Sequence, residues 1–144
     1  MKPYRLLSTT LACLILVGFA PAHAQGGGDA HRAEDRARHQ KIAAAHEAAA
    51  ACLQGKGDAK ACQEQLRADC RGLAVGTHCG LRSGPDGLKD AARRIDEHRR
   101  MAAIHTAAAQ CLAGDKPYRE CLAQLGKDCG GLGVGKYCGM RHAH

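Results

Sequence analysis

One cysteine pattern, present twice, constrains the fold of this chain more than any other feature of its sequence. Cysteines with the spacing C-x9-C-x7-C-x8-C occur at Cys52, Cys62, Cys70 and Cys79, and the same spacing returns without change at Cys111, Cys121, Cys129 and Cys138. A gapless alignment of residues 39–82 with residues 98–141 has 22 identical positions among 44 by direct count. We interpret this self-similarity as an internal duplication.

The first 24 residues have the parts of a secretory signal peptide. Lys2 and Arg5 make the start positive, residues 6–20 are apolar, and small side chains up to residue 24 predict cleavage before Gln25. The apolar run is shorter than the roughly 20 residues that a membrane-spanning helix needs. We therefore expect a periplasmic or secreted protein without a membrane span after cleavage.

Cleavage would remove Cys13 and leave eight cysteines, all of them in the repeated pattern. An even number of cysteines in an exported chain predicts a disulfide framework. Two of the 21 basic residues would also leave, so 19 would face 14 acidic residues and the net charge would be +5. Tyr118 and Tyr137 would be the only remaining Phe, Trp or Tyr residues, which argues against nucleic-acid binding by base stacking.

The first unit contains signals for two helices. Residues 33–53 are rich in alanine and charged residues and lack glycine and proline, which favours a long helix. Gly55 is expected to end it, and Asp58 can cap a short helix that runs to about Cys70. A glycine-containing loop follows at residues 71–80.

The second unit repeats this order. A long helix is expected over residues 86–112, and Gly114 is expected to stop it. Pro117 suits the first position of a short helix that ends near Cys129. The expected fold class is therefore all-α, a tandem duplication of a disulfide-stapled helical hairpin made of a long helix, a turn, a short helix and a Gly-rich loop. The expected divisions of the chain are a signal peptide (1–24), a flexible start leading into the first helix (25–38), the first cysteine-rich repeat (39–82), a linker leading into the second long helix (83–97), the second repeat (98–141) and a histidine tail (142–144).

Helix geometry limits which cysteines can pair. Cys62 and Cys70 would lie about 12 Å apart on a continuous short helix, whereas a disulfide needs Cα atoms within about 7 Å. Cys52 and Cys62 lie on either side of the hairpin turn and should face each other. We therefore predict the pairs Cys52–Cys62, Cys70–Cys79, Cys111–Cys121 and Cys129–Cys138.

Histidine recurs on the apolar stripe of both long helices. His39 and His46 take heptad position a in the first, and His98 and His105 take it in the second. Two histidines on one helix are about 10.5 Å apart and cannot both reach one ion through bonds near 2.0 Å. If the long helices are antiparallel, His39 faces His105 and His46 faces His98. These pairs are either core histidines or copper or zinc sites that need further ligands, and the sequence leaves both open.

Other histidines and the cysteines carry weaker signals. His78 is replaced by Tyr137 in the second unit, which argues against a role shared by both units. Reduced cysteines could bind zinc or Cu(I), but the chain has no C-x2-C pair among them and export favours disulfides.

No catalytic motif is present, so we expect no enzyme activity. The sequence favours an exported, cysteine-rich repeat protein without a cofactor, acting as an envelope binding or stress-protective module for an unknown partner. The alternative is a periplasmic copper- or zinc-binding protein that uses the histidines between its repeats.

Overall fold

The computed structural model describes residues 26–82 and 90–140 and shows an all-helical protein. Its four helices are α1 (Gly26–Gln54), α2 (Ala59–Asp69), α3 (Ala91–Ala113) and α4 (Tyr118–Asp128). Within the described residues the β pairing is one isolated antiparallel bridge, between Leu81 and Gly133. The all-α expectation is confirmed. The expected signal peptide, the first half of the linker and the histidine tail lie outside the described residues.

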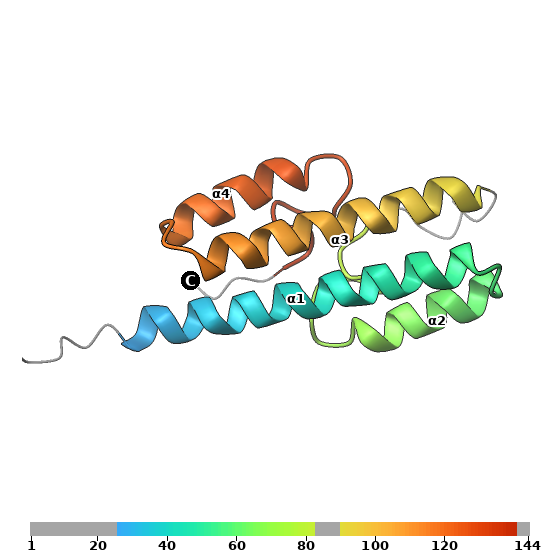
Figure 1. Ribbon diagram of the computed structural model, residues 1–144, viewed down its shortest axis with the longest axis horizontal. Coiled ribbons are helices and arrows are strands. Elements are labelled where there is room, and N and C mark those ends of the chain that lie inside the picture. The colour runs from blue at the N-terminus through green and yellow to red at the C-terminus, as the bar shows by residue number, and fades with distance from the viewer. Residues whose placement is uncertain (1–25, 83–89, 141–144) are drawn as a thin grey trace, which may run out of the picture.

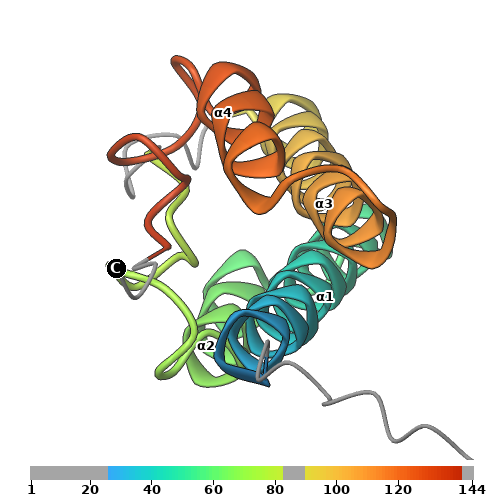
Figure 2. The same cartoon turned by 90° about the vertical axis from the view of Figure 1, so that its left-hand side faces the viewer.

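The two long helices form the centre of the molecule. Figure 1 shows α1 and α3 side by side and running in opposite directions, and their mutual contact is the most extensive between any two helices. Each short helix packs against the long helix that precedes it. The end-on view in Figure 2 shows the loops after α2 and α4 meeting between those two helices.

The first helix begins earlier than its composition predicts. It starts at Gly26, so the glycines that were expected to form a flexible start lie inside α1. A contact distant in sequence supports this extension, because the guanidinium of Arg32 donates hydrogen bonds to three carbonyl oxygens at the C-terminal end of α3, those of Cys111, Leu112 and Gly114. The last carbonyls of a helix lack the usual i+4 N–H partner within it, and a cation is favourable at that end.

The other helix ends follow the local sequence signals closely. Asp58 caps α2, where its carboxylate accepts a hydrogen bond from the Ala61 backbone N–H at 3.0 Å. Asp90 caps α3 in the same way, and residues 86–89 of the predicted helix lie outside the described residues. Pro117 occupies the N-cap of α4 rather than the first helical position. Either place suits proline, because the first N–H groups of a helix have no intrahelical acceptor.

All four predicted disulfides are present. Cys52–Cys62 and Cys111–Cys121 join the two sides of each hairpin turn, with Cα atoms 5.7 and 5.6 Å apart. Cys70–Cys79 and Cys129–Cys138 tie each Gly-rich loop to the end of its short helix, with Cα atoms 5.2 and 5.4 Å apart. Every bond therefore closes within one hairpin.

Each hairpin has an apolar cluster that the other hairpin completes. Met140, from the second loop, packs in the cluster of Ile42 and Leu66. Leu81, from the first loop, packs with the equivalent residues of the second hairpin, Met101 and Leu125. Because Leu81 and Met140 are equivalent when residues 39–82 are aligned with residues 98–141, the exchange is reciprocal.

The loop backbones cross with the same reciprocity. The Val75 N–H donates to the Gly139 carbonyl at 2.8 Å, and the Val134 N–H donates to the Gly80 carbonyl at 2.7 Å. Val75 is equivalent to Val134 in the same alignment, and Gly80 is equivalent to Gly139. The hairpins therefore meet through an approximately two-fold interface, in which each surface contacts its counterpart.

Gly80→Ala should destabilise the protein far more than Gly76→Ala. Both glycines have φ values in the left-handed region, +81° and +85°, where an alanine costs roughly 1–2 kcal/mol. A Cβ on Gly80 would also overlap the Cys138 carbonyl, whereas one on Gly76 would meet nothing within 4 Å. Overpacking adds roughly 1–3 kcal/mol. Thermal denaturation of the two oxidised variants measures the difference, and equal losses would show that the loops do not cross this closely.

Candidate functional site

The four stripe histidines meet in pairs at the interface between α1 and α3. The Nδ1 atoms of His39 and His105 are 2.7 Å apart, and those of His46 and His98 are 2.9 Å apart. These are the pairs expected for antiparallel long helices. His39, His46 and His105 are fully buried, and His98 is 5% exposed. Each pair therefore shares a hydrogen bond within the protein interior.

The backbone selects the tautomer of one pair. His46 Nε2 lies 3.4 Å from the carbonyl oxygen of Cys79, which can only accept a hydrogen bond. A neutral His46 therefore carries its proton on Nε2, so that its Nδ1 accepts and the Nδ1–H of His98 donates. The loop closed by the Cys70–Cys79 disulfide thus orients the histidine pair.

This pair remains neutral at pH 7. Burial lowers the pKa of His46 to about 4, and the charge of a protonated His98 would lower it further. Burial also lowers the pKa of His98 to about 4, assisted by the positive charge of Arg94. A buried imidazole loses hydration when it is charged, which explains the direction of both shifts.

The surroundings of the His46–His98 pair are basic. Arg94 lies one helical turn before His98 on α3 and is only 6% exposed. His78, in the loop after α2, is close enough to lower the pKa values of both paired histidines. Burial lowers the pKa of His78 itself, with further contributions from the charges of Arg67 and Arg94.

The surroundings of the His39–His105 pair are acidic and phenolic. Asp35 lies one turn before His39 on α1 and is also 6% exposed. Its carboxylate accepts a hydrogen bond from the Tyr118 hydroxyl at the start of α4. Burial raises the pKa of Tyr118, and the hydrogen bond and negative charge of Asp35 raise it further.

Asp35, Arg94 and Tyr118 were not among the candidate residues predicted from the sequence. A signal was available for the first two, because each precedes a stripe histidine by four residues and so lies on the same helical face. Tyr118 had no comparable signal, since only the packing of α4 against the α1–α3 pair brings its hydroxyl to Asp35.

The histidine pairs supply too few ligands for a metal ion in this arrangement. Two nitrogens bound to tetrahedral zinc at 2.0–2.1 Å lie about 3.3 Å apart, farther than either observed Nδ1 pair. Within residues 26–82 and 90–140, no three His, Cys, Asp or Glu side chains are grouped so that they could hold an ion. The eight pattern cysteines are disulfide-bonded and cannot act as thiolate ligands. The observed geometry suits hydrogen-bonded imidazoles.

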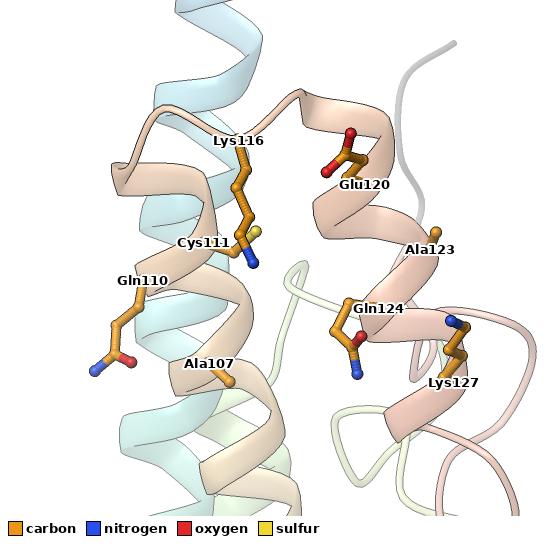
Figure 3. Close-up of a pocket in the computed structure, with 8 residues that line it drawn as sticks. All are labelled: Ala107, Gln110, Cys111, Lys116, Glu120, Ala123, Gln124 and Lys127. Carbon is orange, nitrogen blue, oxygen red and sulfur yellow. The ribbon is translucent and has the colours of Figure 1, made fainter.

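An open groove of about 520 Å³ lies between α3 and α4 (Figure 3). Figure 3 shows Gln124 and Lys127 on α4 and Lys116 and Glu120 near the turn, whereas the side chain of Gln110 on α3 points away from α4 in this view. The lining includes alanines and charges of both signs but no histidine. The groove therefore does not include the paired histidines or the buried charged residues beside them.

A scan against models of known families finds no match, and no curated protein or solved structure matches the chain. None of the helices in the described part of the chain is both long enough and apolar enough to span a membrane.

Proposed function

We propose that the protein is an exported, non-catalytic helical module that acts in the cell envelope by binding a partner or protecting against stress. Four disulfides, each closed within one hairpin, are the observation that carries this proposal. Such a framework forms and persists in oxidising compartments, and an exported chain reaches one. The signal-like first 24 residues support the same destination.

We also infer that the module arose by tandem duplication of one hairpin. The 22 identities over 44 positions support this origin, and so do the reciprocal loop contacts between equivalent residues of the two repeats. A single hairpin of this kind would have paired with a second copy through the same two-fold interface. The fused chain keeps that arrangement and leaves each half free to change independently.

The histidine pairs support a non-catalytic role. Each pair directs an Nδ1 atom of one ring at an Nδ1 atom of the other, and all four rings are buried. A general acid or base must instead reach a substrate proton within hydrogen-bond distance. We propose that the pairs hold α1 and α3 in register.

Protein purified from the exported fraction should contain no free thiol and no bound metal, and should begin at Gln25. Thiol titration under denaturing conditions, N-terminal sequencing and metal analysis measure these properties. Peptide mapping without reductant should recover Cys52 joined to Cys62 and Cys129 joined to Cys138. Disulfides between the hairpins, or reduced cysteines in the exported protein, would contradict the proposal.

One alternative is favoured by a specific observation, the presence of two buried imidazole pairs. A copper or zinc protein would use these pairs after the rings moved apart and further ligands joined them. In that case Zn(II) or Cu(II) should raise the melting temperature of the oxidised protein. The effect should survive truncation before His142 and be halved by the double change His46→Ala and His98→Ala. A metal-independent melting curve would exclude this alternative.

A further inference from the structure

Basic side chains from α2, the loop after it and α3 lie near the His46–His98 pair. Besides His46 on α1 and His98 on α3, they include Arg67 on α2, His78 in the following loop and Arg94 on α3. His78 directly precedes Cys79, whose carbonyl oxygen lies 3.4 Å from His46 Nε2, and Arg94 precedes His98 by one helical turn. Arg67 and Arg94 lower the pKa of His78, and His78 lowers the pKa values of His46 and His98, so these groups also lie within electrostatic range. At pH 7 the positive charge of this cluster lies on the two guanidinium groups, and like charges destabilise one another unless an anion is present.

The counterpart site around His39–His105 lacks these cations. At the equivalent positions of the other repeat and its leading helix, the sequence has Gly126 in place of Arg67, Tyr137 in place of His78 and Asp35 in place of Arg94. The paired histidines themselves are the same in both copies. The fold therefore does not require the three basic groups, because its other half positions an equivalent histidine pair without them.

Two buried donors in the basic cluster have no acceptor in the described residues. These are Nε of Arg94 and Nε2 of His78. Arg94 is only 6% exposed. Among the described residues, Glu97 is the carboxylate that raises the pKa of Arg94. Its side chain forms an ion pair with Arg93 at 3.1 Å. A buried guanidinium without a counter-ion is costly, and each unmet donor adds to that cost.

The loop also prepares His78 to donate. Its Nδ1 lies 3.0 Å from the hydroxyl oxygen of Thr77, which can donate a hydrogen bond to it. A neutral His78 then carries its proton on Nε2, the atom that lacks an acceptor. An anion with several oxygen atoms could accept from this N–H and from the Arg94 guanidinium together.

We propose that Arg67, His78 and Arg94, beside the His46–His98 pair, bind a small dianionic oxyanion of the phosphate class. Several acceptor oxygens match the unmet donors, and two negative charges offset the two guanidinium groups. The burial of Arg94 restricts the ligand to a small ion. This assignment specifies the ligand of the proposed binding module and rests on that function. The thiol and metal measurements test the module separately, because their results do not depend on phosphate.

The test uses the oxidised mature protein and inorganic phosphate as the probe. Melting temperatures are measured at pH 7 in a buffer without phosphate, with sodium chloride holding the ionic strength constant. We expect a saturable rise of roughly 10 °C when phosphate is about 100 times its dissociation constant. Isothermal titration should give one phosphate per chain.

Matched arginines on one helix provide the control. Arg94→Gln and His78→Gln should each abolish the phosphate-dependent rise, whereas Arg100→Gln, which changes an exposed arginine of the same helix, should retain it. Succinate at equal concentration tests whether a dicarboxylate serves instead. The proposal is overturned if phosphate adds nothing beyond sodium chloride, if Arg94→Gln keeps the rise, or if succinate alone produces it.

Discussion

Reduction of the four disulfides should unfold this protein at 37 °C. Their loops span sequence separations of only 9 or 10 residues, and each bond contributes about 2–3 kcal/mol in the chain-entropy model. The sum is on the order of 10 kcal/mol, comparable with the whole stability of a small domain. Alanines make up much of the buried surface of α1 and α3, so the apolar core offsets little of that loss.

Far-UV circular dichroism with and without reductant measures this effect. We expect most of the helical signal at 37 °C to disappear after reduction and to return on reoxidation. The paired change Cys52→Ala and Cys62→Ala should cost about as much as Cys111→Ala and Cys121→Ala, because both remove a turn bond of the same span. A reduced protein that kept its helix content and melting temperature would show that helix packing alone stabilises the fold.

Acidification from pH 7 to pH 4 should also destabilise the oxidised protein. The pKa values of His46 and His98 are about 4 in the folded state and about 6.5 when the chain is unfolded. Between these values the unfolded chain binds more protons, so the free energy of unfolding falls as the pH falls. The loss is complete near pH 4 and absent above pH 6.5. For the two histidines together it is on the order of a few kcal/mol.

The double change His46→Leu and His98→Leu isolates this contribution. Leucine suits the apolar heptad position, and the variant cannot protonate there. Chemical denaturation at intervals between pH 7 and pH 4.5 should show a smaller loss of stability for the variant than for the wild type. Carboxylates titrate in both proteins and cancel in the comparison. Parallel curves would mean that neither histidine changes its pKa on folding.

Local sequence signals predicted the helices and the disulfides well because both depend on nearby residues. Asp58 and Gly114 begin or end helices through contacts within a few residues. The cysteine pairing follows from the length of one turn and one loop, which leaves few closures that satisfy disulfide geometry. The start of α1 at Gly26 was missed because Arg32 is held by carbonyls far away in the sequence, at the end of α3.

The candidate site was also predicted only in part from the sequence. The heptad positions placed His39, His46, His98 and His105 on two apolar faces, and the antiparallel packing of α1 and α3 then decided the pairs. The different surroundings of the pairs could not be read from either helix alone. They arise where the loop after α2 and the start of α4 bring His78 and Tyr118 close to the paired helices.

The sequence by itself therefore determined an all-α chain with four disulfides inside two similar hairpins, since those features are local. Only the tertiary structure decided that the hairpins exchange Leu81 and Met140 between their cores and that Arg94 and Asp35 occupy equivalent buried places. The physical reason is that burial and electrostatic environment belong to groups from several elements at once. The spacing along one helix specifies which face a side chain shares, but not which charge it meets across the interface.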